Sequence, residues 1–149
     1  MTKHGTILLV EDNANDIVVI RKAFAEAGVH NPLQTVHSGE EAVKYLGGQG
    51  KFADREKFPL PFLALLDLKM SHEDGFAVLR WLYERPGLKK KFTLIVLGSD
   101  SSDSEVQLAY ELGAQSYLLK PIDFKQLTDT VRHVKEYWIE LNRLPEGAA

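Results

Sequence analysis

Cysteine is absent from the 149 residues of the chain. Its absence excludes disulfide bonds, thiolate nucleophiles and cysteine-ligated zinc, and it is typical of a reducing compartment. No apolar run approaches the roughly 18 residues of a membrane span. The apolar start, Ile7 to Val10, meets the charged residues Glu11 and Asp12, so it does not have the form of a secretion signal. We therefore expect a cytoplasmic protein without a membrane partner.

An excess of positive charge is also missing, because the formal net charge is −3. The basic run from Lys89 to Lys91 is typical of a solvated loop, and we expect no nucleic-acid partner. The five histidines lack the spacing of metal ligands and are interpreted as structural or surface residues. The GGQG at 47–50 lacks the spacing and the preceding strand of a nucleotide-binding loop. Neither a zinc site nor a nucleotide site is predicted.

What the chain does contain is an alternation of two periodicities. Its 44% hydrophobic and 26% charged residues are typical of one globular domain, which we place over residues 1–149 with a core at about 5–135. Apolar residues at helical spacing separate five short apolar runs, most of which lack polar alternation and therefore predict strands buried on both faces. The predicted strands are Thr6–Val10, Leu33–Val36, Phe62–Leu66, Leu94–Leu97 and Ser116–Leu119. This order predicts an α/β fold, with a doubly wound, parallel five-stranded sheet covered by helices on both faces.

Polar residues follow four of the predicted strands. In parallel sheets a site forms at the carboxyl ends of the strands, so these residues are expected to converge on one edge. The residues that follow these strands are Glu11 and Asp12, Asp67, the run Gly98, Ser99 and Asp100, and Lys120 with Pro121. Each one alone is typical of a helix cap or a solvated loop, but their joint placement predicts a functional site.

Asp67 interrupts the apolar stretch LALLDLKM at 63–70. A buried carboxylate needs a partner or a metal, because an unpaired charge is costly to bury. Carboxylates that converge with a carbonyl group and waters make an all-oxygen site suited to Mg²⁺. Lys120 supplies a second positive group at the same edge. We therefore predict that the strand delivers Asp67 to a metal at the edge of the sheet.

Three motifs occur in this order on these elements: EDN at 11–13, LLDLKM-x-x-x-DGF at 65–76 and SYLLKP at 116–121. Together they resemble the receiver domain of two-component response regulators. The resemblance implies a flavodoxin-like fold, with Asp67 as phospho-acceptor and Lys120 as the lysine that contacts the phosphoryl group. It also implies that Glu11, Asp12, Asp67 and the backbone carbonyl of Lys69 bind the metal, Mg²⁺. The peptide between this lysine and the following proline is usually cis in the family.

Two positions depart from the family pattern. The proline that usually follows the acceptor by four residues is Ser71, which we expect only to loosen its loop. The Thr or Ser that usually bonds the phosphoryl group is Gly98, and the nearest hydroxyl, on Ser99, points the other way if the strand continues. Tyr117, the aromatic residue that usually responds to that hydroxyl, is retained. Gly98 leaves it room to turn inward before phosphorylation, and weaker conformational coupling is expected.

Three functions compete. The first is a signalling receiver that accepts a phosphoryl group from a histidine kinase or phosphotransfer protein. Its only enzymatic activities would be its own phosphorylation and autodephosphorylation. The second is a degenerate receiver that acts as a constitutive binding module, as Gly98 suggests. The third is a phosphohydrolase with an aspartyl-phosphate intermediate. That class generally needs a second Asp two residues after the nucleophile, where this chain has Lys69.

The C-terminal segment predicts a long helix, from Phe124 to about Leu144, and we expect no output domain after it. Its YWxxLxRLP ending, with the long connection at 47–61, is similar to stand-alone regulators paired with phytochromes, which implies a light-sensing kinase as donor. The apolar residues at 137–139 and 141 cannot all face one sheet, so a homodimer through this helix is predicted. The alternative is a monomer whose tail packs back on itself. The 47–61 connection is interpreted as an insertion, with a contact surface as the alternative.

Overall fold

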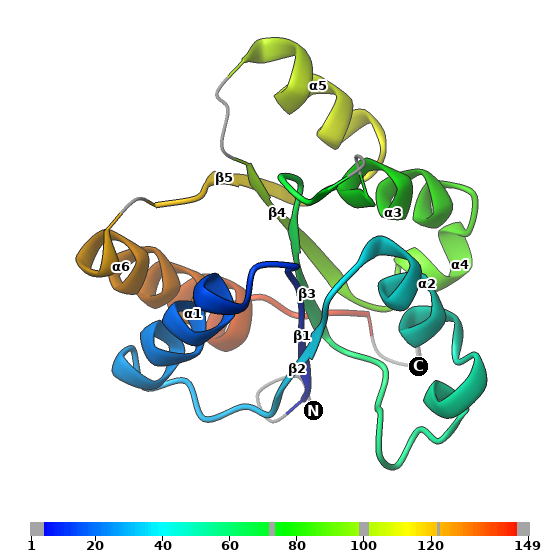
Figure 1. The fold of residues 1–149 in the computed structure, drawn as a ribbon, viewed down its shortest axis with the longest axis horizontal. Helices are drawn as coiled ribbons and strands as arrows, with labels where there is room; N and C mark the ends of the chain where they lie inside the picture. Colours follow the sequence, from blue (N-terminus) through cyan, green and yellow to red (C-terminus); the bar gives the residue numbers. More distant parts are fainter. Residues whose placement is uncertain (1–4, 72–73, 99–101, 122, 146–149) are drawn as a thin grey trace.

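The computed structural model describes residues 5–71, 74–98, 102–121 and 123–145, and its elements alternate between strand and helix (Figure 1). The strands are β1 (Ile7–Val10), β2 (Leu33–Val36), β3 (Leu63–Asp67), β4 (Thr93–Gly98) and β5 (Ser116–Leu119). The helical elements are α1 (Ala14–Glu26), α2 (Gly39–Gly47), η2 (Gly50–Ala53), α3 (Asp74–Tyr83), α4 (Pro86–Lys89), α5 (Asp103–Glu111), α6 (Phe124–Val134) and η4 (Lys135–Leu141). The five predicted strands are confirmed to within one residue at each end.

The strands form one parallel sheet in the order β2-β1-β3-β4-β5. This is the flavodoxin-like order, in which the chain reverses its direction of winding after β2. Ile7 lies opposite Leu63 and Leu66 lies opposite Val96, so the three central strands end at nearly the same level. The register therefore places the residues that follow β1, β3 and β4 next to one another, and the predicted flavodoxin-like fold is confirmed.

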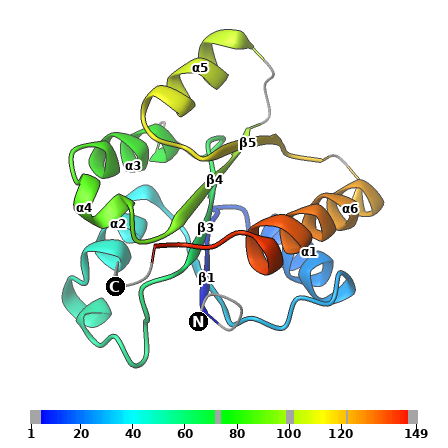
Figure 2. The same cartoon turned by 180° about the vertical axis from the view of Figure 1, so that it is seen from behind.

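Alternate residues of the central strands enter two separate cores. One core contains Leu8, Leu66 and Val96 and is closed by α2 and α3, while the other contains Leu9 and Leu65 and is closed by α1 and α6. Figures 1 and 2 show these two groups of helices on opposite faces of the sheet. Because β1, β3 and β4 are buried on both faces, the ends of these strands are firmly held.

The prediction of burial on both faces is wrong for parts of the two outer strands. Three residues of β2 are half-buried, and β5 ends at the exposed residue Leu119. Both strands lie at an edge of the sheet and have one neighbouring strand only, which leaves part of their surface to solvent. The apolar sequences of these strands do not distinguish an edge from a central position.

The connection at 47–61 is a folded part of the core. Phe52 is buried in η2, and its ring packs with those of Tyr45 and Phe58 at centroid distances of 5.0 to 6.0 Å. The guanidinium group of Arg55 donates hydrogen bonds to the carbonyl oxygens of Tyr45 and Leu46, at 2.8 and 3.0 Å. These carbonyls belong to the last turn of α2, where Tyr45 also accepts from the N–H of the C-cap residue Gly48. The aromatic residues here serve packing.

The C-terminal helix differs from the predicted regular helix to about Leu144. Regular winding ends at Val134, and the chain continues as the π-helical segment η4 to Leu141, closed by a 2.6 Å hydrogen bond from the Asn142 N–H to the Tyr137 carbonyl. The wider turn brings Ile139 into the core beside α1 and α6 and leaves Leu141 exposed. No helix in the described part of the chain is both long and apolar enough to span a membrane.

Candidate phosphoryl-acceptor site

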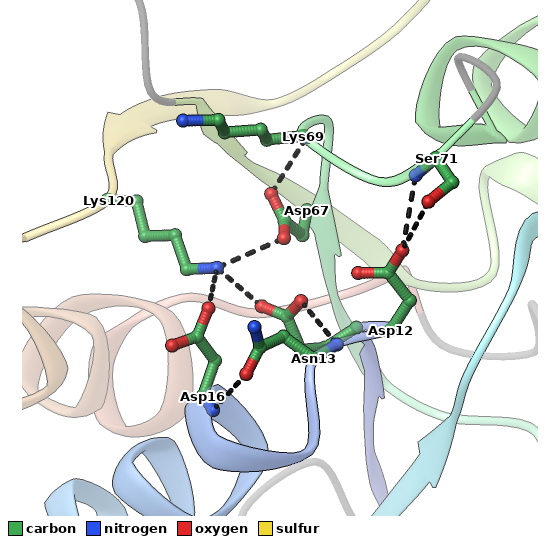
Figure 3. Close-up of polar contacts among 8 residues, drawn as sticks. Asp12, Asn13, Asp16, Asp67, Lys69, Ser71 and Lys120 are labelled. Atoms are coloured by element: carbon green, nitrogen blue, oxygen red, sulfur yellow. Dashed lines mark hydrogen bonds and ion pairs between the residues drawn. The ribbon is translucent and has the colours of Figure 1, made fainter.

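Asp67 is the last residue of β3 and is almost completely buried, with 1% of its surface exposed. Its Oδ1 accepts a hydrogen bond of 2.8 Å from the backbone N–H of Lys69. Its Oδ2 accepts one of 3.0 Å from the ammonium group of Lys120 (Figure 3). The carboxylate is thus fixed by contacts to both oxygens, and the backbone of Asp67 pairs with Leu97 on β4. A rigid, paired carboxylate at a sheet edge explains why an apolar strand ends in aspartate.

Lys120 reaches this edge from the end of β5. Its backbone N–H donates a 2.7 Å hydrogen bond to the Gly98 carbonyl, which ties the residue to β4. Its ammonium group donates to Glu11 Oε1 at 2.6 Å and to Asp16 Oδ2 at 2.8 Å, besides Asp67. No cis peptide bond occurs in the described residues, so the Lys120–Pro121 peptide is trans. Lys120 therefore bridges the carboxylates of three elements.

Glu11, Asp12 and Asp67 each offer a carboxylate oxygen, and these oxygens lie within 4.8 Å of one another. Glu11 and Asp67 are buried, whereas Asp12 is exposed, so the cluster opens to solvent on the Asp12 side. Hard divalent cations prefer oxygen ligands, and Mg²⁺ retains several waters when bound by a few carboxylates. The donor set and the open side therefore fit a divalent cation of this kind.

Burial raises the pKa of Glu11 to about 7, and the neighbouring Asp67 carboxylate adds to the rise. The pKa of Lys120 is raised as well: burial acts against the charged form, but the hydrogen bonds to Asp16 and Glu11 outweigh it. Negative charge is thus crowded at this edge, and one ammonium group offsets only part of it. A bound divalent cation would relieve the repulsion between Glu11 and Asp67.

Ser71 contacts the site, contrary to the expectation that it only loosens its loop. Its backbone N–H and its hydroxyl both donate to Asp12 Oδ2, at 3.1 and 3.3 Å. The proline usual at this position would offer neither donor. On the same side, the Asn13 N–H donates to Glu11 Oε2 at 3.2 Å. The two acidic residues after β1 are therefore oriented by the neighbouring backbone (Figure 3).

Gly75 allows α3 to begin directly behind the acceptor. A Cβ atom at this position would lie 2.7 Å from the Leu68 Cα and 2.9 Å from the Asp67 carbonyl oxygen. Both are backbone atoms and cannot rotate away. The glycine of the DGF motif is thus required by the close approach of α3 to the end of β3.

Gly98, at the end of β4, borders the side chain of Tyr117. A Cβ atom at Gly98 would overlap the Tyr117 hydroxyl and ring, so the ring occupies the space that a side chain would need. The hydroxyl of Tyr117 donates a short hydrogen bond to Glu105 Oε2 on α5. Tyr117 is thus turned inward, toward the end of β4. Ser99 lies outside the described residues.

The structure therefore brings together Glu11, Asp12, Asp67 and Lys120, as predicted, while their roles in catalysis and metal binding stay predictions. Two further contacts, those of Asp16 and Glu105, did not emerge from the sequence. Asp16 lies in the first turn of α1, three residues after the N-cap Asn13, where an acidic residue is typical of a helix start. No signal in the sequence distinguishes it from such a residue, because its contact with Lys120 depends on the fold.

A buried carboxylate at the end of β3, faced by a lysine and by an acidic pair, is the arrangement that the resemblance to receiver domains implies. The sequence matches the Response regulator receiver domain family over residues 7–132. The chain thus belongs to the response regulator receiver family of two-component signal transduction.

Relatives cover nearly the whole chain. It is 35% identical over 147 residues to a probable methanogenesis regulatory protein, FilR2, of Methanothrix harundinacea, covering 95% of this chain and 88% of that protein. The phosphorylated cyanobacterial phytochrome response regulator RcpA has a crystal structure similar to this one, with a TM-score of 0.85 and 34% identity, and the match covers 96% of this chain and 99% of that one. The Mn²⁺-bound form of response regulator Rcp1 has a TM-score of 0.81 at 31% identity, with 95% and 99% covered.

Proposed function

We propose that the chain is a phosphorylation-dependent signalling switch that accepts a phosphoryl group on Asp67. The observation that carries this function is the Lys120 ammonium group, which joins Asp67 to the acidic cluster at the edge of the sheet. Asp67 is held with both oxygens engaged and its neighbours are oxygen donors, so the site is organised for charge and positioning. Phosphoryl transfer depends mainly on these two factors.

In the proposed reaction, a carboxylate oxygen of Asp67 attacks the phosphorus of a phosphohistidine. The phosphorus–nitrogen bond breaks, its electron pair returns to the histidine ring, and an acyl phosphate forms on Asp67. Lys120 donates a hydrogen bond to a phosphoryl oxygen. Glu11, Asp12, Asp67 and the Lys69 carbonyl would hold Mg²⁺, which offsets charge on the transferring group when it is bound. Attack of water on phosphorus later returns Asp67 and inorganic phosphate, which is the autodephosphorylation we propose.

The donor is a histidine kinase or phosphotransfer protein. A light-sensing phytochrome kinase is the donor that the relatives suggest, because RcpA is a phytochrome response regulator. Incubation of the chain with autophosphorylated candidate kinases tests this assignment. Fast transfer from a phytochrome kinase, and slow transfer from unrelated kinases, is the expected result. Equal rates from all donors would contradict it.

The second candidate function is a degenerate receiver that binds its partner without phosphorylation. The inward Tyr117, bonded to Glu105, favours it, because the position usually adopted in response to phosphorylation is already occupied. Mg²⁺-dependent labelling of Asp67 by acetyl phosphate separates the two functions. The phosphohydrolase alternative has no support at Lys69, whose side chain is exposed and carries no carboxylic acid.

Replacing Glu11 and Asp12 together, by Gln and Asn, is expected to abolish Mg²⁺ binding. Two of the three ligand charges are removed, while the size of each side chain is kept. Isothermal titration of the variant and of the unchanged chain with MgCl₂ measures the effect. As a control, Glu40→Gln removes one charge from an exposed site on α2 and should leave Mg²⁺ affinity unchanged. Undiminished affinity in the double variant would move the metal site elsewhere.

A homodimer through the C-terminal segment is also proposed. Tyr137 and Leu141 are 52% and 70% exposed, whereas Ile139 is buried and Trp138 packs partly on the same core. Truncation at Lys135 would remove Ile139 from the core, so substitution of the exposed pair is the cleaner change. Tyr137→Lys with Leu141→Lys is expected to convert a dimer into a monomer in sedimentation velocity. A monomeric mass for the unchanged chain would exclude this dimer.

A further inference from the structure

The ammonium group of Lys120 has used all its hydrogen-bond donors before any phosphoryl group arrives. A lysine has three N–H donors. Those of Lys120 contact Glu11, Asp16 and Asp67, at 2.6, 2.8 and 3.0 Å (Figure 3). A phosphoryl group on Asp67 can therefore receive a hydrogen bond from Lys120 only if one of these contacts is released.

The three partners of Lys120 differ in how easily they can be released. The side chains of Glu11 and Asp67 are each 1% exposed, whereas that of Asp16 is 42% exposed. A buried carboxylate that loses its cation remains unsolvated, which is strongly unfavourable. The carboxylate of Asp16 can be hydrated in place of its ion pair. Asp16 is thus the partner with the smallest cost of release.

Asp16 is also held in place on its own side. It lies in the first turn of α1, and its backbone N–H donates a 3.0 Å hydrogen bond to the side chain of Asn13, the N-cap of the helix. A negative charge is favourable at this position because of the helix dipole. The carboxylate thus stays near Lys120, on the side of α1.

We propose that Asp16 is a positioning residue that retains the Lys120 ammonium group and competes with the phosphoryl group for it. The inference rests on the proposed phosphorylation of Asp67 and adds a step to it. As the phosphoryl group binds, the ion pair between Asp16 and Lys120 opens, and the freed N–H donates to a phosphoryl oxygen. Asp16 therefore limits the affinity of the site for phosphoryl groups.

Binding of beryllofluoride, a phosphoryl mimic, at saturating Mg²⁺ tests this role by ¹⁹F NMR. Asp16→Asn removes the competing charge and is expected to tighten binding about fivefold, a modest factor because the ion pair is half-exposed. Asp16→Ser removes the charge independently of the amide and should act in the same direction. Asp16→Glu restores the charge and should return the affinity toward that of the unchanged chain. Glu26→Gln, at the exposed end of the same helix, is the matched control and should have no effect.

A second set of variants separates competition for Lys120 from general charge repulsion. In a Lys120→Gln background there is no ammonium group to retain, so Asp16→Asn should no longer tighten binding. Tightening that persists in this background would contradict the inference, as would unchanged affinity in both Asp16→Asn and Asp16→Ser. In either case, beryllofluoride binding to the unchanged chain would leave the proposed function intact. Failure of the unchanged chain to bind beryllofluoride would contradict the proposed function and, with it, the inference.

Discussion

Asp67→Asn is expected to reduce phosphoryl labelling of the chain to background while the fold is kept. The amide has nearly the same size as the carboxylate and can still accept hydrogen bonds from Lys69 and Lys120, but it lacks the nucleophilic charge. Labelling by acetyl phosphate in the presence of Mg²⁺ gives the readout, and circular dichroism checks the fold.

A matched control makes the Asp67 result specific. Asp129→Asn makes the same chemical change on the exposed surface of α6, where Asp129 pairs only with Arg132 among the described residues. This variant should be phosphorylated by acetyl phosphate to the same extent as the unchanged chain. Label that persists in the Asp67→Asn protein would show that another residue accepts the phosphoryl group.

Gly98→Thr is expected to enlarge the structural response of Tyr117 to phosphorylation. Any Cβ at Gly98 overlaps the inward Tyr117, so the ring must turn outward and its hydrogen bond to Glu105 is lost before phosphorylation. The new hydroxyl can then bond the phosphoryl group, a contact worth about 1.5 to 3 kcal/mol. That is comparable to the few kcal/mol that separate two conformations. The unchanged chain already has Tyr117 inward, so its response should be smaller.

NMR of the Tyr117 ring, with and without beryllofluoride, measures this response. Gly98→Ala is the matched control, because it displaces the ring without supplying a hydroxyl. We expect Tyr117 to be outward in both variants before the mimic is added. With the mimic, its environment should change more in Gly98→Thr than in Gly98→Ala, although the Cβ keeps the ring from the position that it occupies in the unchanged chain. If the unchanged chain shows a full two-state shift that Gly98→Thr leaves as it is, then Ser99 or a backbone N–H has taken the place of the missing hydroxyl.

Much of the fold could be predicted because β1, β3 and β4 are buried on both faces. Their continuous apolar sequences mark strand limits sharply, and the carboxyl ends of parallel strands must share an edge. Those two facts were sufficient to predict that Asp67 and Lys120 lie close together. The half-buried outer strands and the π-helical winding of η4 were not predictable, because both depend on neighbours in space.

The part of the site that the sequence did not reveal lies off the strand ends. Asp16 and Glu105 belong to helices, where a carboxylate is usually a solvated residue, and only the fold shows that each faces a polar group of β5 or its end. Ser71 was interpreted from the proline it replaces, whereas its contacts with Asp12 depend on the path of the loop after β3. The positions of Asp16, Glu105 and Ser71 in the site all depend on contacts between segments that are distant in sequence.

The central claim, that Asp67 is a working phospho-acceptor, is tested most directly by the intact mass of the unchanged chain after incubation with acetyl phosphate. With Mg²⁺, we predict a gain of one phosphoryl group per chain, located on the peptide that contains Asp67. Without Mg²⁺, the gain should be nearly absent. An unchanged mass in the presence of Mg²⁺ and excess acetyl phosphate would contradict the account and favour a constitutive binding module.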